Sequence, residues 1–156
     1  ELPYEGHDLS MVVLLPDEGA FGAFEAALDA GQVDALVGDI TYRQVALAMP
    51  RFEFDAQFSL ADTLAAMGMP AAFSDQADFS GITGSRELFI SAVIHKAFVS
   101  VDEEGTEAAA ATAVAMKLSS APMEPLEVRL DRPFLFLIRD IETGTVLFAG
   151  RVVDPS

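Results

Sequence analysis

The sequence predicts an α+β fold in one domain. Short apolar runs with strand character are mixed with segments in which apolar residues recur at helical spacing, and the two kinds do not follow a βαβ rhythm. A length of 156 residues suits one domain, and a hydrophobic content of 51% allows a sizeable core. No internal repeat is evident.

The strands are predicted from apolar runs and from alternation. Leu2–Tyr4 is short and apolar, and Ser10–Leu15 is a continuous apolar run before Pro16, which is typical of a strand buried on both faces. Alternation of apolar and charged residues after Pro50 predicts a half-exposed strand, with Phe52, Phe54 and Ala56 on one side. Other strands are expected at 42–49, 88–101, 134–138 and 146–153, the last two joined by a turn at 142–145.

Helices are predicted where apolar residues recur every three or four positions. Phe21–Leu28 follows this spacing and ends before Gly31, and Val33–Val37 is expected to form a second short helix. Ser59–Met67 is expected to be helical, with Ser59 as the capping residue and Asp62 completing a weak capping box. Residues 73–85 are expected to form a polar, glycine-bearing connection.

One segment has two local interpretations. Residues 108–116 carry no charge, proline or glycine, although exposed loops normally carry turn residues and charge. Thr106 could cap a helix of alanines, and alanine has the highest helix propensity. Alternatively, the run is an extended segment that enters a sheet. The apolar runs on both sides of it favour the extended interpretation.

Composition limits the partners and the chemistry. The formal net charge of −16 argues against nucleic acid and anionic membranes as partners. Lysine occurs only at Lys96 and Lys117, which is compatible with a high-salt setting or with compositional drift. There is no cysteine and no apolar run long enough to span a membrane.

Few residues are suited to catalysis or metal binding. His7 lies in a turn and is expected to be solvated, whereas His95, in an apolar strand with Ser91, is expected to be buried and hydrogen-bonded in a sheet. Asp102 would lie about 23 Å from His95 along an extended strand, at about 3.3 Å per residue, so a local Ser-His-Asp triad fails. No metal or cofactor site and no catalytic centre are expected.

Six sequence motifs occur in an order that resembles a known family. They are Leu14-Leu15-Pro16-Asp17-Glu18-Gly19, Ala77-Asp78-Phe79-Ser80-Gly81, His95-Lys96-Ala97-Phe98, Glu103-Glu104-Gly105-Thr106-Glu107-Ala108-Ala109-Ala110-Ala111-Thr112, Asp131-Arg132-Pro133-Phe134-Leu135-Phe136 and Leu147-Phe148-Ala149-Gly150-Arg151-Val152. In this order and spacing, over nearly all of the chain, they resemble the C-terminal portion of a prokaryote-like inhibitory serpin.

The resemblance implies a fold, a domain boundary and a mechanism. Residues 1–156 would be the C-terminal fragment of one serpin domain, with a reactive-centre loop at about 104–125 and an N-terminal portion missing. Serpins inhibit serine proteases as suicide substrates: the protease cuts the loop, and the loop inserts into the central sheet while the acyl-enzyme is trapped. The chain would then not be an enzyme. The resemblance also implies that a fragment without its sheet partners folds poorly alone.

The resemblance also assigns site residues. The loop hinge would comprise Gly105, Thr106, Glu107, Ala108, Ala109, Ala110, Ala111 and Thr112. Ser91 and His95 would lie where the central sheet opens, and Glu103 would form a salt bridge with Arg51. Counting from Thr106 places the scissile bond between Ser119 and Ser120, with Leu118-Ser119 as the alternative.

The expected partner is a serine protease. The small and apolar neighbourhood of the scissile bond fits elastase-like, chymotrypsin-like or subtilisin-like enzymes. The full-length protein is expected to be monomeric and extracellular or secreted, with its signal in the missing portion. A non-inhibitory serpin-fold protein that acts by binding or as a chaperone is the alternative, and an unrelated domain with an alanine-rich helix is the third interpretation.

Overall fold

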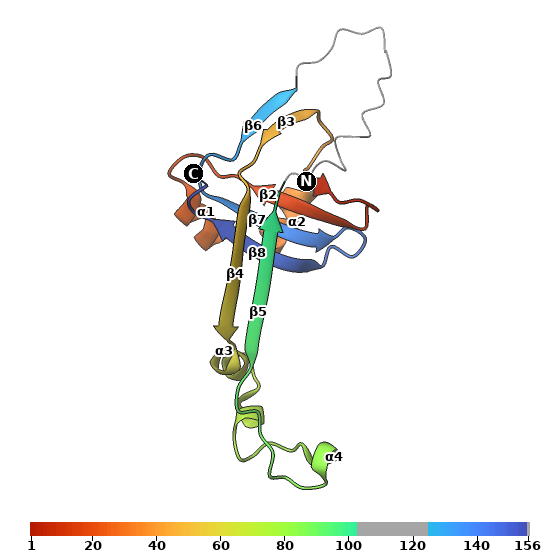
Figure 1. Cartoon of the computed structure of the whole chain (residues 1–156), viewed down its shortest axis with the longest axis vertical. Coiled ribbons are helices and arrows are strands. Elements are labelled where there is room, and N and C mark those ends of the chain that lie inside the picture. Colours follow the sequence, from red (N-terminus) through yellow and green to blue (C-terminus); the bar gives the residue numbers. More distant parts are fainter. Residues whose placement is uncertain (103–124, 156) are drawn as a thin grey trace. The chain divides into compact units, whose positions relative to one another are not determined.

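A computed structural model describes residues 1–102 and 125–155 of the chain. The chain divides into two compact units, one of residues 1–52 and 101–156 and one of residues 53–100. Helices and strands are mixed in the order shown in Figure 1, so the predicted α+β class is confirmed.

The first unit is built on a four-stranded sheet with the order β1-β2-β7-β8. These strands are Leu2–Pro3, Leu9–Leu14, Phe134–Asp140 and Val146–Val152, and every neighbouring pair is antiparallel. Three consecutive residues of β2, Ser10 to Val12, are buried, which confirms the prediction of a strand covered on both faces. Phe134 and Phe136 of β7 are exposed by 0% and 1%, so the core of this unit lies on β2 and β7.

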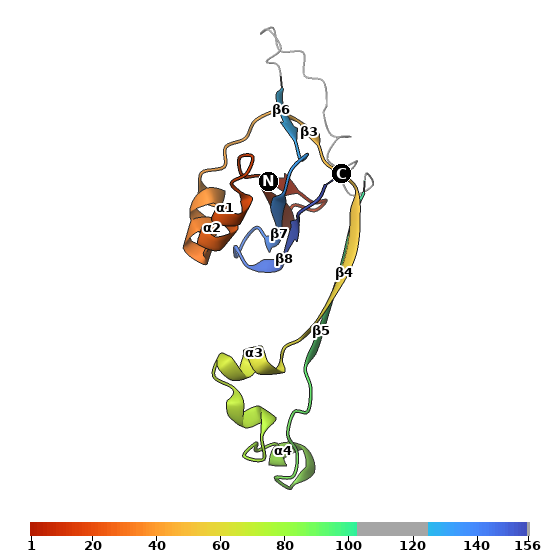
Figure 2. The same cartoon turned by 90° about the vertical axis from the view of Figure 1, so that its left-hand side faces the viewer.

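Two helices lie beside this sheet. Helix α1 is Phe21–Ala27 and helix α2 is Ala30–Gly38, close to the predicted segments although α2 begins earlier. The Asp29 side chain caps α2 by accepting a hydrogen bond from the Gln32 amide at 2.8 Å. Arg151 of β8 donates to both carboxylate oxygens of Glu25 at 2.8 and 3.0 Å, which ties α1 to the sheet. Figure 2 shows both helices on the same side of the strands.

A second, smaller sheet in this unit is the parallel pair of β3, Val45–Ala48, and β6, Leu126–Arg129. The strand β3 covers only part of the predicted segment 42–49, and residues 41–44 before it do not form a strand. β6 begins two residues after the undescribed segment 103–124. The β3–β6 pair therefore adjoins the C-terminal end of the predicted loop.

The second unit contains most of the pair of β4, Phe52–Ser59, and β5, Ile94–Val101. The end residues Phe52 and Val101 belong to the first unit. Their arrows point in opposite directions in Figure 1. Alternate residues of β4 from Phe52 to Ala56 are half-buried and the intervening ones exposed, as predicted for a half-exposed strand. The helices of this unit are α3, Ala61–Ala66, the 3-10 helix η1, Pro70–Phe73, and α4, Ser80–Thr83.

Three sequence predictions are wrong in this unit. The N-cap of α3 is Leu60, without a side-chain cap, so Ser59 does not close a capping box because it is the last residue of β4. The predicted strand 88–101 begins only at Ile94. Before Ile94, the Ile90 amide donates to the Ala72 carbonyl, and the Val93 carbonyl accepts a hydrogen bond from the Leu60 amide. The predicted polar connection 73–85 contains the single helical turn α4.

Candidate functional site

The predicted reactive loop joins the end of β5 to the start of β6. The residues assigned to its hinge and scissile bond lie outside the described residues: Gly105, Thr106, Glu107, Ala108, Ala109, Ala110, Ala111, Thr112, Leu118, Ser119 and Ser120. Glu103, the predicted partner of Arg51, also lies there. The structure therefore describes the two strands that flank the loop, and the assignments within it stay predictions.

The N-terminal flank of the predicted loop is β5. This strand pairs with β4 and ends at Val101, and the next residue, Asp102, is exposed. Ala97, Val99 and Val101 are half-buried and alternate with exposed residues. The pattern is that of a strand with one face more buried than the other.

The C-terminal flank is β6. Leu126 and Val45 are register partners in the parallel β3–β6 pair, and the Leu126 amide donates to the Gln44 carbonyl at 3.0 Å. The Leu130 amide donates to Ala48 at 2.8 Å at the other end of the pair. The polypeptide after the predicted loop is thus fixed by backbone hydrogen bonds from its first strand residue onward.

Arg51 lies in the connection between β3 and β4 and is exposed. The next residue, Phe52, packs its ring against Phe134 at 6.1 Å and Phe136 at 5.5 Å between ring centroids. Phe134 and Phe136 are buried, so Phe52 fixes the backbone beside Arg51 to the core of β7. The sequence predicted which side of the strand Phe52 occupies, but it did not predict these aromatic contacts.

The prediction that His95 is buried in a sheet is wrong for the described chain. His95 is exposed and stacks on Phe58, with ring centroids 6.5 Å apart and an interplanar angle of 17°. Ser91 is also exposed and lies before the start of β5. In the described residues β4 is the neighbour of β5 in a two-stranded sheet, and two strands do not enclose a side chain. His7 is exposed in its turn, as expected.

Two aspartates, the exposed Asp78 and the half-buried Asp140, organise turns. The Ser80 hydroxyl donates to the Asp78 carboxylate at 2.6 Å, and the Ser80 amide donates to it at 3.1 Å. Arg86 forms an ion pair with the same carboxylate at 2.8 Å. These contacts lower the pKa of Asp78. Hydrogen bonds from the side chain and amide of Thr143 lower the pKa of Asp140 in the same way. Both carboxylates are used within their own turns and are not poised for proton transfer.

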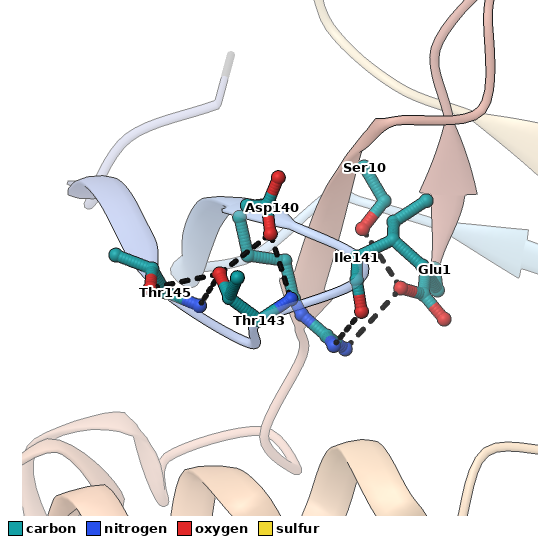
Figure 3. Close-up of polar contacts among 7 residues, drawn as sticks. Glu1, Ser10, Asp140, Ile141, Thr143 and Thr145 are labelled. Carbon is teal, nitrogen blue, oxygen red and sulfur yellow. Dashed lines mark hydrogen bonds and ion pairs between the residues drawn. The ribbon is translucent and has the colours of Figure 1, made fainter.

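A third polar cluster joins the N-terminal residue to the sheet. The buried hydroxyl of Ser10 donates to Glu1 Oε1 at 2.7 Å, and Arg139 approaches the same oxygen at 3.4 Å (Figure 3). Burial raises the pKa of Tyr4, the residue that follows β1. In the described ranges no group of three or more His, Cys, Asp or Glu side chains could hold a metal ion.

The comparisons with known proteins identify the family. The family described as Serpin (serine protease inhibitor) matches residues 1–155, so the chain belongs to the serpin family. It is similar to a serpin-like protein of Thermococcus kodakarensis, with 48% identity over 158 residues that cover 99% of this chain and 37% of the relative. It is also similar to Serpin B3 of Homo sapiens, with 46% identity covering 99% of this chain and 40% of that protein.

The fold agrees with this assignment. The crystal structure of uncleaved ovalbumin matches with a TM-score of 0.79 and 30% identity, covering 98% of this chain and 38% of that chain. The chain spans about two fifths of the length of the curated relatives it matches. Among the described helices, none has the length and apolar content to cross a membrane.

Proposed function

We propose that this chain is the C-terminal part of an inhibitory serpin and that the full-length protein traps serine proteases as a suicide substrate. The observation that carries the proposal is the composition of the hinge in a member of this family. The protein would be consumed in the reaction and would catalyse nothing.

The hinge residues are suited to insertion into a sheet. Gly105 changes conformation without a Cβ penalty. With Thr106 facing inward in strand register, Ala108, Ala110 and Thr112 also face inward, and small side chains avoid the overpacking that costs about 1–3 kcal/mol at a buried site. Residues 108–116 carry neither charge nor proline, so insertion would bury no unpaired charge and lose no ladder hydrogen bond.

The proposed hinge contact links Glu103 to Arg51. The guanidinium of Arg51 offers a planar fork for a bidentate contact with a carboxylate. Arg51 is exposed, so the pair would contribute about 1 kcal/mol or less. Its role would be to hold the end of β5 beside the fixed start of β4.

The proposed target is an elastase-like, chymotrypsin-like or subtilisin-like serine protease that cuts between Ser119 and Ser120. The flanking residues are small or apolar apart from Lys117, which suits pockets for small or medium apolar side chains. Such pockets discriminate only about 10–200-fold per methylene-sized change, so several proteases should be accepted. We place the full-length monomer outside the cell, with no membrane or nucleic-acid partner.

The direct test is an SDS-stable complex between the full-length protein and proteases of these three classes. Mass spectrometry of the C-terminal peptide released from the denatured complex identifies the bond. A peptide that starts at Ser120 supports the assignment, one that starts at Ser119 moves the cut by one residue, and any other start rejects it. If no protease forms a complex, the inhibitory proposal is wrong and a non-inhibitory binding or chaperone role becomes the better interpretation.

A hinge substitution tests the insertion step. Thr106→Arg would require a charge to enter the sheet unpaired, so insertion should slow until the acyl-enzyme hydrolyses. The variant should be cleaved at the same bond but yield little complex, which makes it a substrate. Thr106→Ser is the matched control and should keep the complex yield of the parent protein. An unchanged yield in Thr106→Arg would contradict the mechanism.

A further inference from the structure

We draw no further inference here: the strongest candidate, the apolar cavity of about 320 Å³ in the first unit that β2, α1 and α2 line with Val13, Phe24 and Leu36, carries nothing, because the chain spans about two fifths of its relatives' length and nothing in the described residues shows what covers the cavity.

Discussion

A methyl group added at Gly150 should destabilise the first unit. Gly150 of β8 faces Phe136 of β7 in the antiparallel register, and the φ of Gly150 lies outside the left-handed region, so an alanine backbone fits. A Cβ atom there would lie 2.6 Å from Cε1 of Phe136 and closer still to Cζ. Carbon atoms at such separations repel strongly, so the ring has to move.

The ring of Phe136 has little room to move. It is 1% exposed, and Phe52 packs against it at 5.5 Å between centroids. Overpacking of this kind costs about 1–3 kcal/mol. Gly150→Ala should therefore lower the free energy of unfolding of the full-length protein by about 1–3 kcal/mol and lower its thermal midpoint.

The assay is thermal unfolding of parent and variant under identical conditions. Gly22→Ala is the matched control: no atom lies within 4 Å of the added Cβ, and helix α1 should gain up to about 1 kcal/mol from alanine. The double variant of Gly150→Ala with Phe136→Leu should cost less than the sum of the two single variants, because the smaller side chain makes room for the methyl group. An unchanged midpoint in Gly150→Ala, or strict additivity in the double variant, would refute the steric argument.

Two further predictions concern turns. His7 has a φ of 61°, a conformation that costs a residue with a Cβ about 1–2 kcal/mol. His7→Gly should therefore raise the free energy of unfolding by up to about 1 kcal/mol, as measured by urea denaturation, while His7→Ala should not. The pKa of Asp78 is lowered in the folded protein, so the stability that it contributes is present above its unfolded pKa and is lost as pH falls through the folded pKa. Ser80→Ala should move the Asp78 pKa upward in an NMR titration and weaken acid resistance, and an unmoved pKa would contradict the assigned cause.

Much of the fold could be predicted because the relevant information is local. The apolar run that stops at Pro16 predicted β2, and its burial on both faces is confirmed. Alternation after Pro50 predicted which residues of β4 are half-buried. Helical spacing placed α1 to within one residue of its observed end at Ala27. The serpin assignment also came from the sequence, because the order of several motifs is a property of the chain itself.

Predictions failed where the outcome depends on residues far away in sequence. Ser59 is a good capping residue, but it is the last residue of β4, so its backbone is extended. Leu88–Val93 has strand propensity, yet Ile90 and Val93 bond to Ala72 and Leu60 instead of a neighbouring strand. His95 lies in an apolar segment, yet it is exposed. Burial of a strand residue depends on what packs over the strand, and in the described residues β5 belongs to a sheet of two strands.

By itself, the sequence determined the family, the α+β class, most of the strands and the composition of the predicted loop hinge. Only the tertiary structure decided that Phe52 packs on Phe134 and Phe136, that Gly150 lies under a phenylalanine ring, and that Val45 and Leu126 are register partners. The physical reason is that propensity and periodicity act over a few residues. Contacts between distant segments depend on register and on which faces are covered.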